Sequence, residues 1–107
     1  MKTQTEETRK LSFVCSRKEL YKVLSTIKMK KTAKLTIATC LFEHKILLKT
    51  AYYEIPIPCI ECSGKDASFS LLLKGMKTFC ELSTNDLIHF SLEGDALQID
   101  TTFINVK

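Results

Sequence analysis

The chain has 107 residues, of which 45% are hydrophobic and 26% are charged, and these totals fit one globular domain. Its three glycines and two prolines leave little room for disordered linkers, and its net charge of +4 permits a nucleic-acid partner without requiring one. No apolar run approaches the length of about 18 residues that a membrane span needs, and the polar N-terminus excludes a signal peptide. We therefore expect a cytoplasmic protein whose five cysteines are reduced thiols.

The chain divides into a flexible polar tail over residues 1–10 and a single domain over residues 11–107. The domain opens with an alternating pattern that places Leu11, Phe13 and Cys15 on one side of a short strand. This strand leads directly into an amphipathic segment.

A helix is predicted from Ser16 to about Lys28. Ser16 can cap its first turn, and Glu19, three residues later, can complete a capping box. The apolar positions have the spacing of one helical stripe, namely Leu20, Val23, Leu24 and Ile27. The opposite side is polar and basic, with Lys18, Lys22 and Ser25 flanked by Arg17 and Lys28, and basic residues continue beyond it in Lys30, Lys31 and Lys34.

Three strands are predicted next, over Lys34–Leu41, Ile46–Tyr52 and Glu54–Cys62. The last of them contains Pro56 and Pro58, which cannot donate ladder hydrogen bonds, so we expect it at a sheet edge. Backbone groups two residues apart point to the same side of a strand, so both prolines remove donors from one side. We expect that side to face outward, where it protects the edge against association.

The order of elements then repeats after a break at Ser63–Asp66. A strand over Ala67–Leu71 and a helix over about Leu72–Leu82 are predicted, and Gly75 weakens this helix by about 1 kcal/mol relative to Ala. The apolar stripe of this helix is expected to comprise Leu72, Met76, Phe79 and Cys80. Three final strands are predicted over Leu87–Leu92, Ala96–Asp100 and Thr102–Val106, with a Gly94 turn between the first two.

The predicted order is therefore strand, helix and three strands, twice, without a strong residue-level repeat. Two helices cannot cover both faces of such a set of strands. The economical solution is an α+β fold in which a duplicated β-α-β-β-β unit places both helices on one side of antiparallel sheets.

Three stretches carry a resemblance to a known family, namely Leu11–Leu20, Ser68–Lys74 and Ile88–Ile99. They are similar to the opening strand and helix, the entry to the second helix, and the following hairpin of a DNA polymerase sliding-clamp domain of the bacterial β-subunit type. Together with the element order, this pattern covers nearly the whole chain after the tail. The chain thus resembles a single domain of such a clamp.

The resemblance implies a mechanism without catalysis. Clamp domains assemble into a six-domain ring whose helices line a hole for duplex DNA, and replication proteins dock on the rim through short peptides. Basic helix residues then meet phosphates independently of base sequence. By position, the candidate nucleic-acid-binding residues are Arg17, Lys18, Lys22, Lys28, Lys30, Lys31, Lys74 and Lys77.

Two features depart from the family. A clamp protomer contains two or three such domains, whereas this sequence contains one. Rings in the family join neighbouring domains by pairing edge strands, and Pro56 and Pro58 lie on one of the edges concerned. The prolines therefore disfavour the family's way of closing a ring, and the oligomeric state stays open. The docking pocket of the family lies between domains and has no residue-by-residue counterpart in one domain.

Simpler interpretations exist for each candidate feature. The basic helix residues can form a solvated surface that keeps the protein in solution. Cys59 and Cys62 have the spacing of a metal or redox pair, but residues three apart in a strand point to opposite faces, which favours ordinary cysteines. Neither His44 nor His89 has, near it in the sequence, a nucleophile or carboxylate in an arrangement that suggests catalysis. We predict no catalytic residue, no metal site and no cofactor.

The function that we predict is a non-catalytic DNA-clamp-like domain, accessory to DNA replication, repair or mobile-element maintenance. It would contact duplex phosphates through its basic helix residues, and its expected partners are duplex DNA and replication or repair proteins, with no membrane. The alternative is a protein-interaction module with the clamp fold that has lost DNA binding. A third class is an enzyme that uses the thiols.

Overall fold

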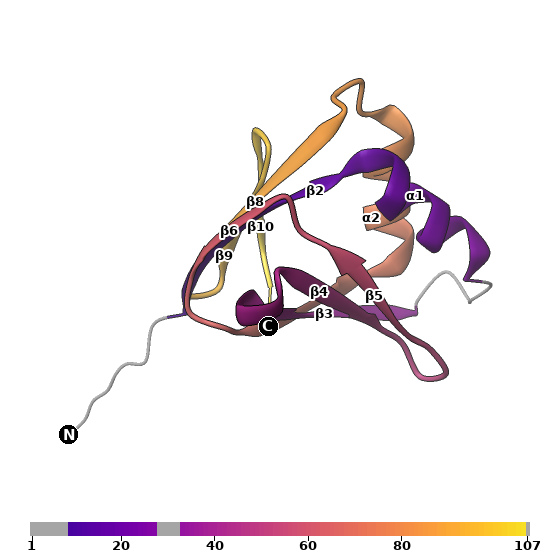
Figure 1. Ribbon diagram of the computed structural model, residues 1–107. Helices are drawn as coiled ribbons and strands as arrows, with labels where there is room; N and C mark the ends of the chain where they lie inside the picture. The colour runs from indigo at the N-terminus through magenta and orange to yellow at the C-terminus, as the bar shows by residue number, and fades with distance from the viewer. Residues whose placement is uncertain (1–8, 28–32, 107) are drawn as a thin grey trace.

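The computed structural model describes residues 9–27 and 33–106, and Figure 1 shows the arrangement of its elements. The first half of the chain contains β2 (Lys10–Ser16), α1 (Arg17–Thr26), β3 (Lys34–Cys40), the 3-10 helix η1 (Leu41–Glu43), β4 (Lys45–Lys49), β5 (Glu54–Pro58) and β6 (Glu61–Gly64). The second half contains β7 (Ser68–Leu72), α2 (Leu73–Leu82), β8 (Leu87–Glu93), β9 (Ala96–Ile99) and β10 (Thr102–Asn105). The predicted duplication of a β-α-β-β-β unit is confirmed, and β6 and η1 are additions to it.

Each half of the chain contributes its first strand to the sheet of the other half. The five-stranded sheet has the order β10-β9-β8-β2-β6, and the four-stranded sheet has the order β5-β4-β3-β7, with every pair antiparallel. Thus β2 pairs with β8 and places Phe13 opposite Phe90, while β7 pairs with β3 and places Phe69 opposite Ile37. Each complete sheet therefore contains strands from both halves.

Three phenylalanine rings join the two exchanged strands at the centre of the core. The rings of Phe13 and Phe90 stack with centroids 4.6 Å apart, and those of Phe13 and Phe69 stack at 6.5 Å. All three side chains are about 1% exposed. Such pairs contribute roughly 0.5–1.5 kcal/mol beyond the burial of their area, so this stack links the halves as well as filling the core.

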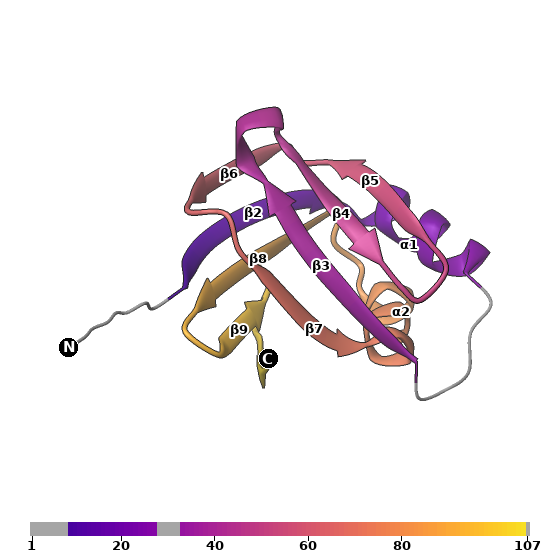
Figure 2. The same cartoon turned by 90° about the horizontal axis from the view of Figure 1, so that it is seen from below.

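Both helices lie on the same side of the molecule and pack against each other, as Figures 1 and 2 show. Leu20 and Leu24 of α1 and Met76 and Cys80 of α2 have at most 1% of their surface exposed, so each helix buries its apolar stripe. The predicted placement of two helices on one side of antiparallel sheets is therefore confirmed.

The junctions between strand and helix differ from the prediction by one or two residues. Helix α1 ends at Thr26, with Ile27 as an extended C-cap, and not at Lys28. Helix α2 begins at Leu73, so Leu73 is the buried member of its stripe, whereas Leu72 is 55% exposed. The prediction of Leu72 as a core residue is wrong, because the run Leu71-Leu72-Leu73 offers no polar residue that would set the register.

The predicted strand Glu54–Cys62 is divided into two strands in different sheets. The amide of Cys59 still donates to His44 O, at 2.7 Å, on the side of β4. The next amide, that of Ile60, donates to Val14 O at 2.8 Å, on the side of β2. The chain therefore changes sheets between these two residues, and β6 continues along the edge of β2.

Strand β5 forms the predicted edge of the four-stranded sheet. Just beyond one end of the β4–β5 ladder, Thr50 N donates to Tyr53 O, and just beyond the other end Cys59 N donates to His44 O. Thr50–Tyr53 and His44–Cys59 are therefore hydrogen-bonded pairs. Because bonded and non-bonded pairs alternate in antiparallel strands, Pro56 and Pro58 occupy non-bonded positions. Their nitrogens point away from β4, which confirms that the prolines face outward.

Arg9 and Lys10, which the sequence analysis assigns to the tail, belong to the described part of the chain. Strand β2 starts at Lys10. The guanidinium of Arg9 donates to Gly94 O at 3.1 Å and to Ser68 O at 2.5 Å, and it pairs with Asp95 at 2.7 Å. Arg9 thus connects the β8–β9 turn to the start of β7, and residues 1–8 lie outside the described part of the chain.

Replacement of Gly75 by alanine is expected to stabilise the protein. Gly75 lies within α2, and an added Cβ would meet no atom within 4 Å. Because glycine costs a helix interior about 1 kcal/mol relative to alanine, the free energy of unfolding should rise by about that amount in a urea titration. A decrease in the free energy of unfolding would show that the backbone of α2 is strained at this position.

Restoring the missing donors on β5 is expected to promote self-association. In the double variant P56A/P58A, two outward amides would become available on an exposed strand. Light scattering should give a larger average mass than that of the unchanged protein at equal concentration, and P56A alone should give a smaller increase. An unchanged mass would contradict the protective role of the prolines.

Candidate nucleic-acid interface

Helix α1 presents two lysines on the side opposite its buried stripe. The helix starts with the predicted cap, because Ser16 Oγ accepts a hydrogen bond from Glu19 N at 3.4 Å. Lys18 and Lys22 are exposed and lie one turn apart, while Leu20 is fully buried between them in sequence. We refer to Lys18 and Lys22 as the α1 lysine pair.

Helix α2 is less basic than α1. Lys74 is exposed in its first turn, Lys77 is half-buried, and Glu81 is exposed. Lys74 occupies the second position of α2, as Lys18 does in α1, and Ser68-Phe69 corresponds to Ser12-Phe13 at the same offset. This correspondence is a residue-level trace of the duplication that the sequence analysis missed.

The described part of the chain provides no ion pair for these lysines. Its salt bridges join Arg9 to Asp95, Lys45 to Glu43 and Lys49 to Glu54. The ammonium groups of the α1 lysine pair and of Lys74 therefore have no carboxylate partner among the described residues, and a phosphate would not have to displace one.

Arg17 differs from the other candidates in its surroundings. Its amide donates to Asp86 O at 2.9 Å, and its Nε donates to Asn85 O at 2.7 Å. Arg17 also acts on the thiol of Cys80: burial raises the pKa of Cys80 to about 11, and the positive charge of Arg17 lowers this pKa in part. The side chain is half-buried and connects the start of α1 to the segment between α2 and β8. A structural role for Arg17 is therefore evident whether or not it also meets phosphate.

Three candidates, Lys28, Lys30 and Lys31, lie outside the described residues. The description resumes at Ala33, whose carbonyl accepts a hydrogen bond from Leu73 N at 3.0 Å. Lys34 follows, exposed at the start of β3 and paired in register with Leu72. Lys34 therefore lies beside the start of α2. Sequence reasoning placed it in the basic segment after the first helix without naming it as a candidate.

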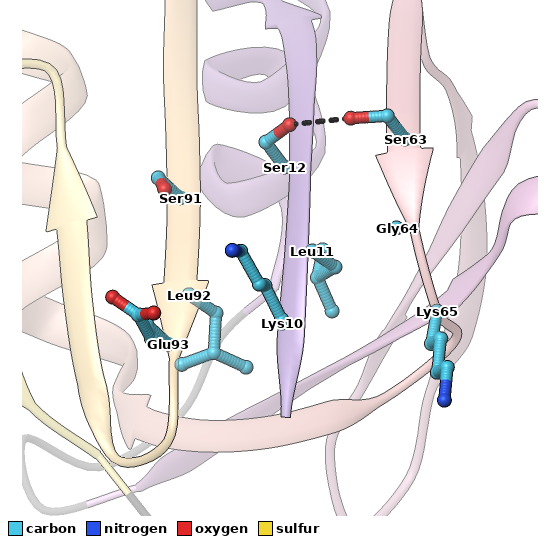
Figure 3. A pocket seen from close by; sticks show the side chains of 9 residues that line it. All are labelled: Lys10, Leu11, Ser12, Ser63, Gly64, Lys65, Ser91, Leu92 and Glu93. Atoms are coloured by element: carbon cyan, nitrogen blue, oxygen red, sulfur yellow. Dashed lines mark hydrogen bonds between the residues drawn. The ribbon is translucent and has the colours of Figure 1, made fainter. Parts of the chain in front are cut away.

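The outer face of the five-stranded sheet contains a hollow of about 490 Å³, shown in Figure 3. Ser12 and Ser63 line it and share a hydrogen bond of 2.9 Å between their hydroxyls. A second hollow of about 280 Å³ shares Ser12, Ser63 and Ser91 with the first, so the two form one shallow trough along β2. Among the described residues, no histidine or carboxylate hydrogen-bonds to the serine hydroxyls of the trough.

The two cysteines with CxxC spacing have different neighbours. The Cys59 thiol is buried and hydrogen-bonds to Cys15, and this hydrogen bond together with burial raises the pKa of Cys15. The Sγ of Cys62 lies 3.7 Å from both Leu41 O and His44 Nδ1. No group of three or more potential metal-ligating side chains occurs within residues 9–27 and 33–106.

An apolar groove of about 370 Å³ lies beside α2. Its lining comes from the end of β7, from α2, and from the β9–β10 region, and it comprises Leu71, Leu72, Gly75, Met76, Phe79, Ile99, Thr102, Ile104 and Asn105. Leu72 is the exposed large apolar side chain of this groove. The sequence analysis missed the groove because it assigned Leu72 to the core.

No protein-family model and no curated protein matches this sequence. Solved structures do match its fold. The β subunit of DNA polymerase III from Thermotoga maritima is 17% identical with a TM-score of 0.69, and the alignment covers 91% of this chain and 29% of that one. The Borrelia burgdorferi subunit, solved in complex with a natural product, is 14% identical with a TM-score of 0.72, and the alignment covers 97% and 31% of the two chains. The Pseudomonas aeruginosa sliding clamp bound to griselimycin is 12% identical with a TM-score of 0.66, and the alignment covers 92% and 30%.

This chain has the fold of one sliding-clamp domain. The clamp-like domain spans less than one third of the length of the β subunits that it matches. At these identities the likeness concerns the fold alone. Among residues 9–27 and 33–106, neither helix has the length and hydrophobicity that a membrane span requires.

The pKa of Cys62 gives a test of the thiol-enzyme interpretation. Desolvation, with smaller contributions from Cys59 and Asp66, raises this pKa above its ordinary value of 9.0. Because the thiolate is the reactive form, iodoacetamide should label Cys62 slowly at pH 7, and the labelling rate should rise with pH and level off only above pH 9.0, as measured by peptide mass spectrometry. Rapid, selective labelling at pH 7 in the folded protein, absent after unfolding in urea, would favour an enzyme.

Proposed function

We propose that the clamp-like domain is a non-catalytic accessory module that contacts the phosphates of duplex DNA. The contact would be made by the α1 lysine pair, with Lys74 from α2 and Lys34 beside it, in a process of DNA replication, repair or mobile-element maintenance. The observation that carries this proposal is the packing of α1 against α2 on one side of the molecule, with exposed lysines on both helices.

The charge arrangement supports this proposal. Each helix uses its apolar stripe to bind the core, so its polar side is free to meet a partner. Lysines without a carboxylate partner release counterions from DNA when they approach phosphates, and this contribution does not depend on base sequence. The solved structures with the same fold are DNA polymerase III β subunits, which supports the replication context.

The expected affinity of one domain is low. With about four phosphate contacts, the slope of log K against log salt concentration would be about −3.6, so binding weakens steeply toward physiological salt. A closed ring can hold DNA by topology, whereas a single domain depends on these contacts. DNA binding should therefore be measured at low salt, and the slope of log K against log salt concentration is the primary readout.

The test compares two double variants that change charge equally. K18E/K22E reverses the α1 lysine pair, and K10E/K65E reverses two exposed lysines at the trough on the five-stranded sheet. Fluorescence anisotropy with a labelled duplex should show binding by the unchanged protein and by K10E/K65E. In K18E/K22E the affinity should fall, and the salt slope should decrease in magnitude by about 1.8, since two contacts are lost.

Equal losses in both double variants would mean that only the net charge matters, and this result would contradict a defined interface. Binding that is insensitive to K18E/K22E alone would contradict the proposed residues. Circular dichroism should confirm that both variants keep the fold, because all four lysines are exposed.

The apolar groove beside α2 favours a second candidate function, a protein-interaction module that has lost DNA binding. A groove of about 370 Å³ with an exposed leucine can accept apolar side chains of a peptide. This function predicts a protein partner that is retained by K18E/K22E in a pull-down and lost by Leu72→Glu. It also predicts no duplex binding by the unchanged protein at low salt.

A further inference from the structure

The outer edges of β5 and β10 differ in the hydrogen-bonding groups that they offer. On β5 the outward positions are Glu54, Pro56 and Pro58, so two of three amide donors are missing. Just after β10, the amide of Val106 donates to Asp95 O at 2.8 Å, so Val106 and Asp95 form a hydrogen-bonded pair next to the β9–β10 ladder. By alternation, Phe103 and Asn105 direct their amides and carbonyls outward.

The edge of β10 has both donors and acceptors and no charged side chain. Its sequence Thr-Phe-Ile-Asn contains none of the lysines or prolines that usually protect an edge. Phe103 is 70% exposed, and among the described residues β9 is the only strand that pairs with β10. On β7, by contrast, the carbonyl of Ser68 is already bound by Arg9.

We propose that β10 is a self-association edge at which a second copy of this chain pairs antiparallel, around a two-fold axis through Ile104. In this register, Phe103 faces Asn105 of the second copy and Asn105 faces its Phe103. Both are outward positions, so the two pairs exchange four backbone hydrogen bonds. Every outward donor and acceptor of the two residues is then satisfied.

The side chains are compatible with this arrangement. Ile104 is half-buried and meets Ile104 of the second copy at the axis, in a non-bonded pair where side chains approach closely. The two Phe103 rings are diagonal neighbours on the other face of the joined strands, within reach of each other. No like charges meet, because β10 is uncharged.

The proline edge explains why the pairing joins two copies of β10 and does not join β10 to β5. An incoming β10 would present two donors and two acceptors to an edge that has lost the amides of Pro56 and Pro58. Pairing around a two-fold axis closes on itself after two chains. The expected product is therefore a dimer and not a ring or a filament.

The contact pairs three residues of each strand, Phe103, Ile104 and Asn105, so it is small and the dimer is weak. Sedimentation and light scattering of the full chain should show a mass that rises from 12.2 kDa toward twice that value, with a dissociation constant between about 10 µM and about 1 mM. A mass that stays at 12.2 kDa up to about 1 mM would overturn the proposal.

Two variants test whether β10 carries the contact. Asn105→Pro removes an outward donor without removing a hydrogen bond to β9, as Pro56 and Pro58 do on β5. Phe103→Lys places two like charges beside the axis. Both should remain monomeric across the concentration series, whereas Phe42→Lys, at a 94% exposed position in η1, should dimerise like the unchanged protein.

Circular dichroism and thermal unfolding identify a variant that fails to fold. If Asn105→Pro fails to fold, the folded Phe103→Lys variant tests whether β10 carries the contact. Dimerisation of either folded variant with the affinity of the unchanged protein would overturn the proposed edge, and loss of the dimer in Phe42→Lys would place the contact elsewhere. The result of this dimerisation test is independent of DNA binding, because none of these residues is among the lysines proposed to contact phosphates.

Discussion

The exchange of first strands between the two sheets is the constraint on which the rest of this fold depends. Strand β2 completes the sheet of β8, β9 and β10, and β7 completes the sheet of β3, β4 and β5. The stacked rings of Phe13, Phe69 and Phe90 join the exchanged strands in the core. Each helix begins directly where its exchanged strand ends, so the positions of α1 and α2 follow from the strand pairing.

The same exchange determines what the surface can offer. Because both helices leave the sheets on one side, the α1 lysine pair and Lys74 belong to neighbouring elements, although they are far apart in sequence. Arg17 stabilises this arrangement through Asn85 and Asp86 of the other half. The last strands of the two repeated β-α-β-β-β units have different edges, since β5 has two prolines and β10 has none. The domain thus has the clamp fold, and its β5 and β10 edges offer different hydrogen-bonding groups.

The sequence predicted features that depend on local spacing. The Ser16 cap and the stripe with Leu20 and Leu24 indicated α1, and the prolines indicated an edge strand. It could not show where a continuous apolar run changes partners, as at Cys59 and Ile60, because alternation continues through the break. Long-range contacts such as that of Arg17 leave no local signal in the sequence. The dipeptide Ser-Phe, which β2 and β7 share, is a trace of the duplication, but it is too short to be recognised without the structure.

We propose that strand exchange holds α1 and α2 together so that their lysines act on one partner. Titration of ¹⁵N-labelled protein with a short duplex at low salt, followed by amide chemical shifts, tests it most directly. We expect the largest changes to occur together in α1 and in the first turn of α2, around Lys18, Lys22 and Lys74. Changes confined to one helix, changes centred on the trough along β2, or none at an excess of duplex would contradict this proposal.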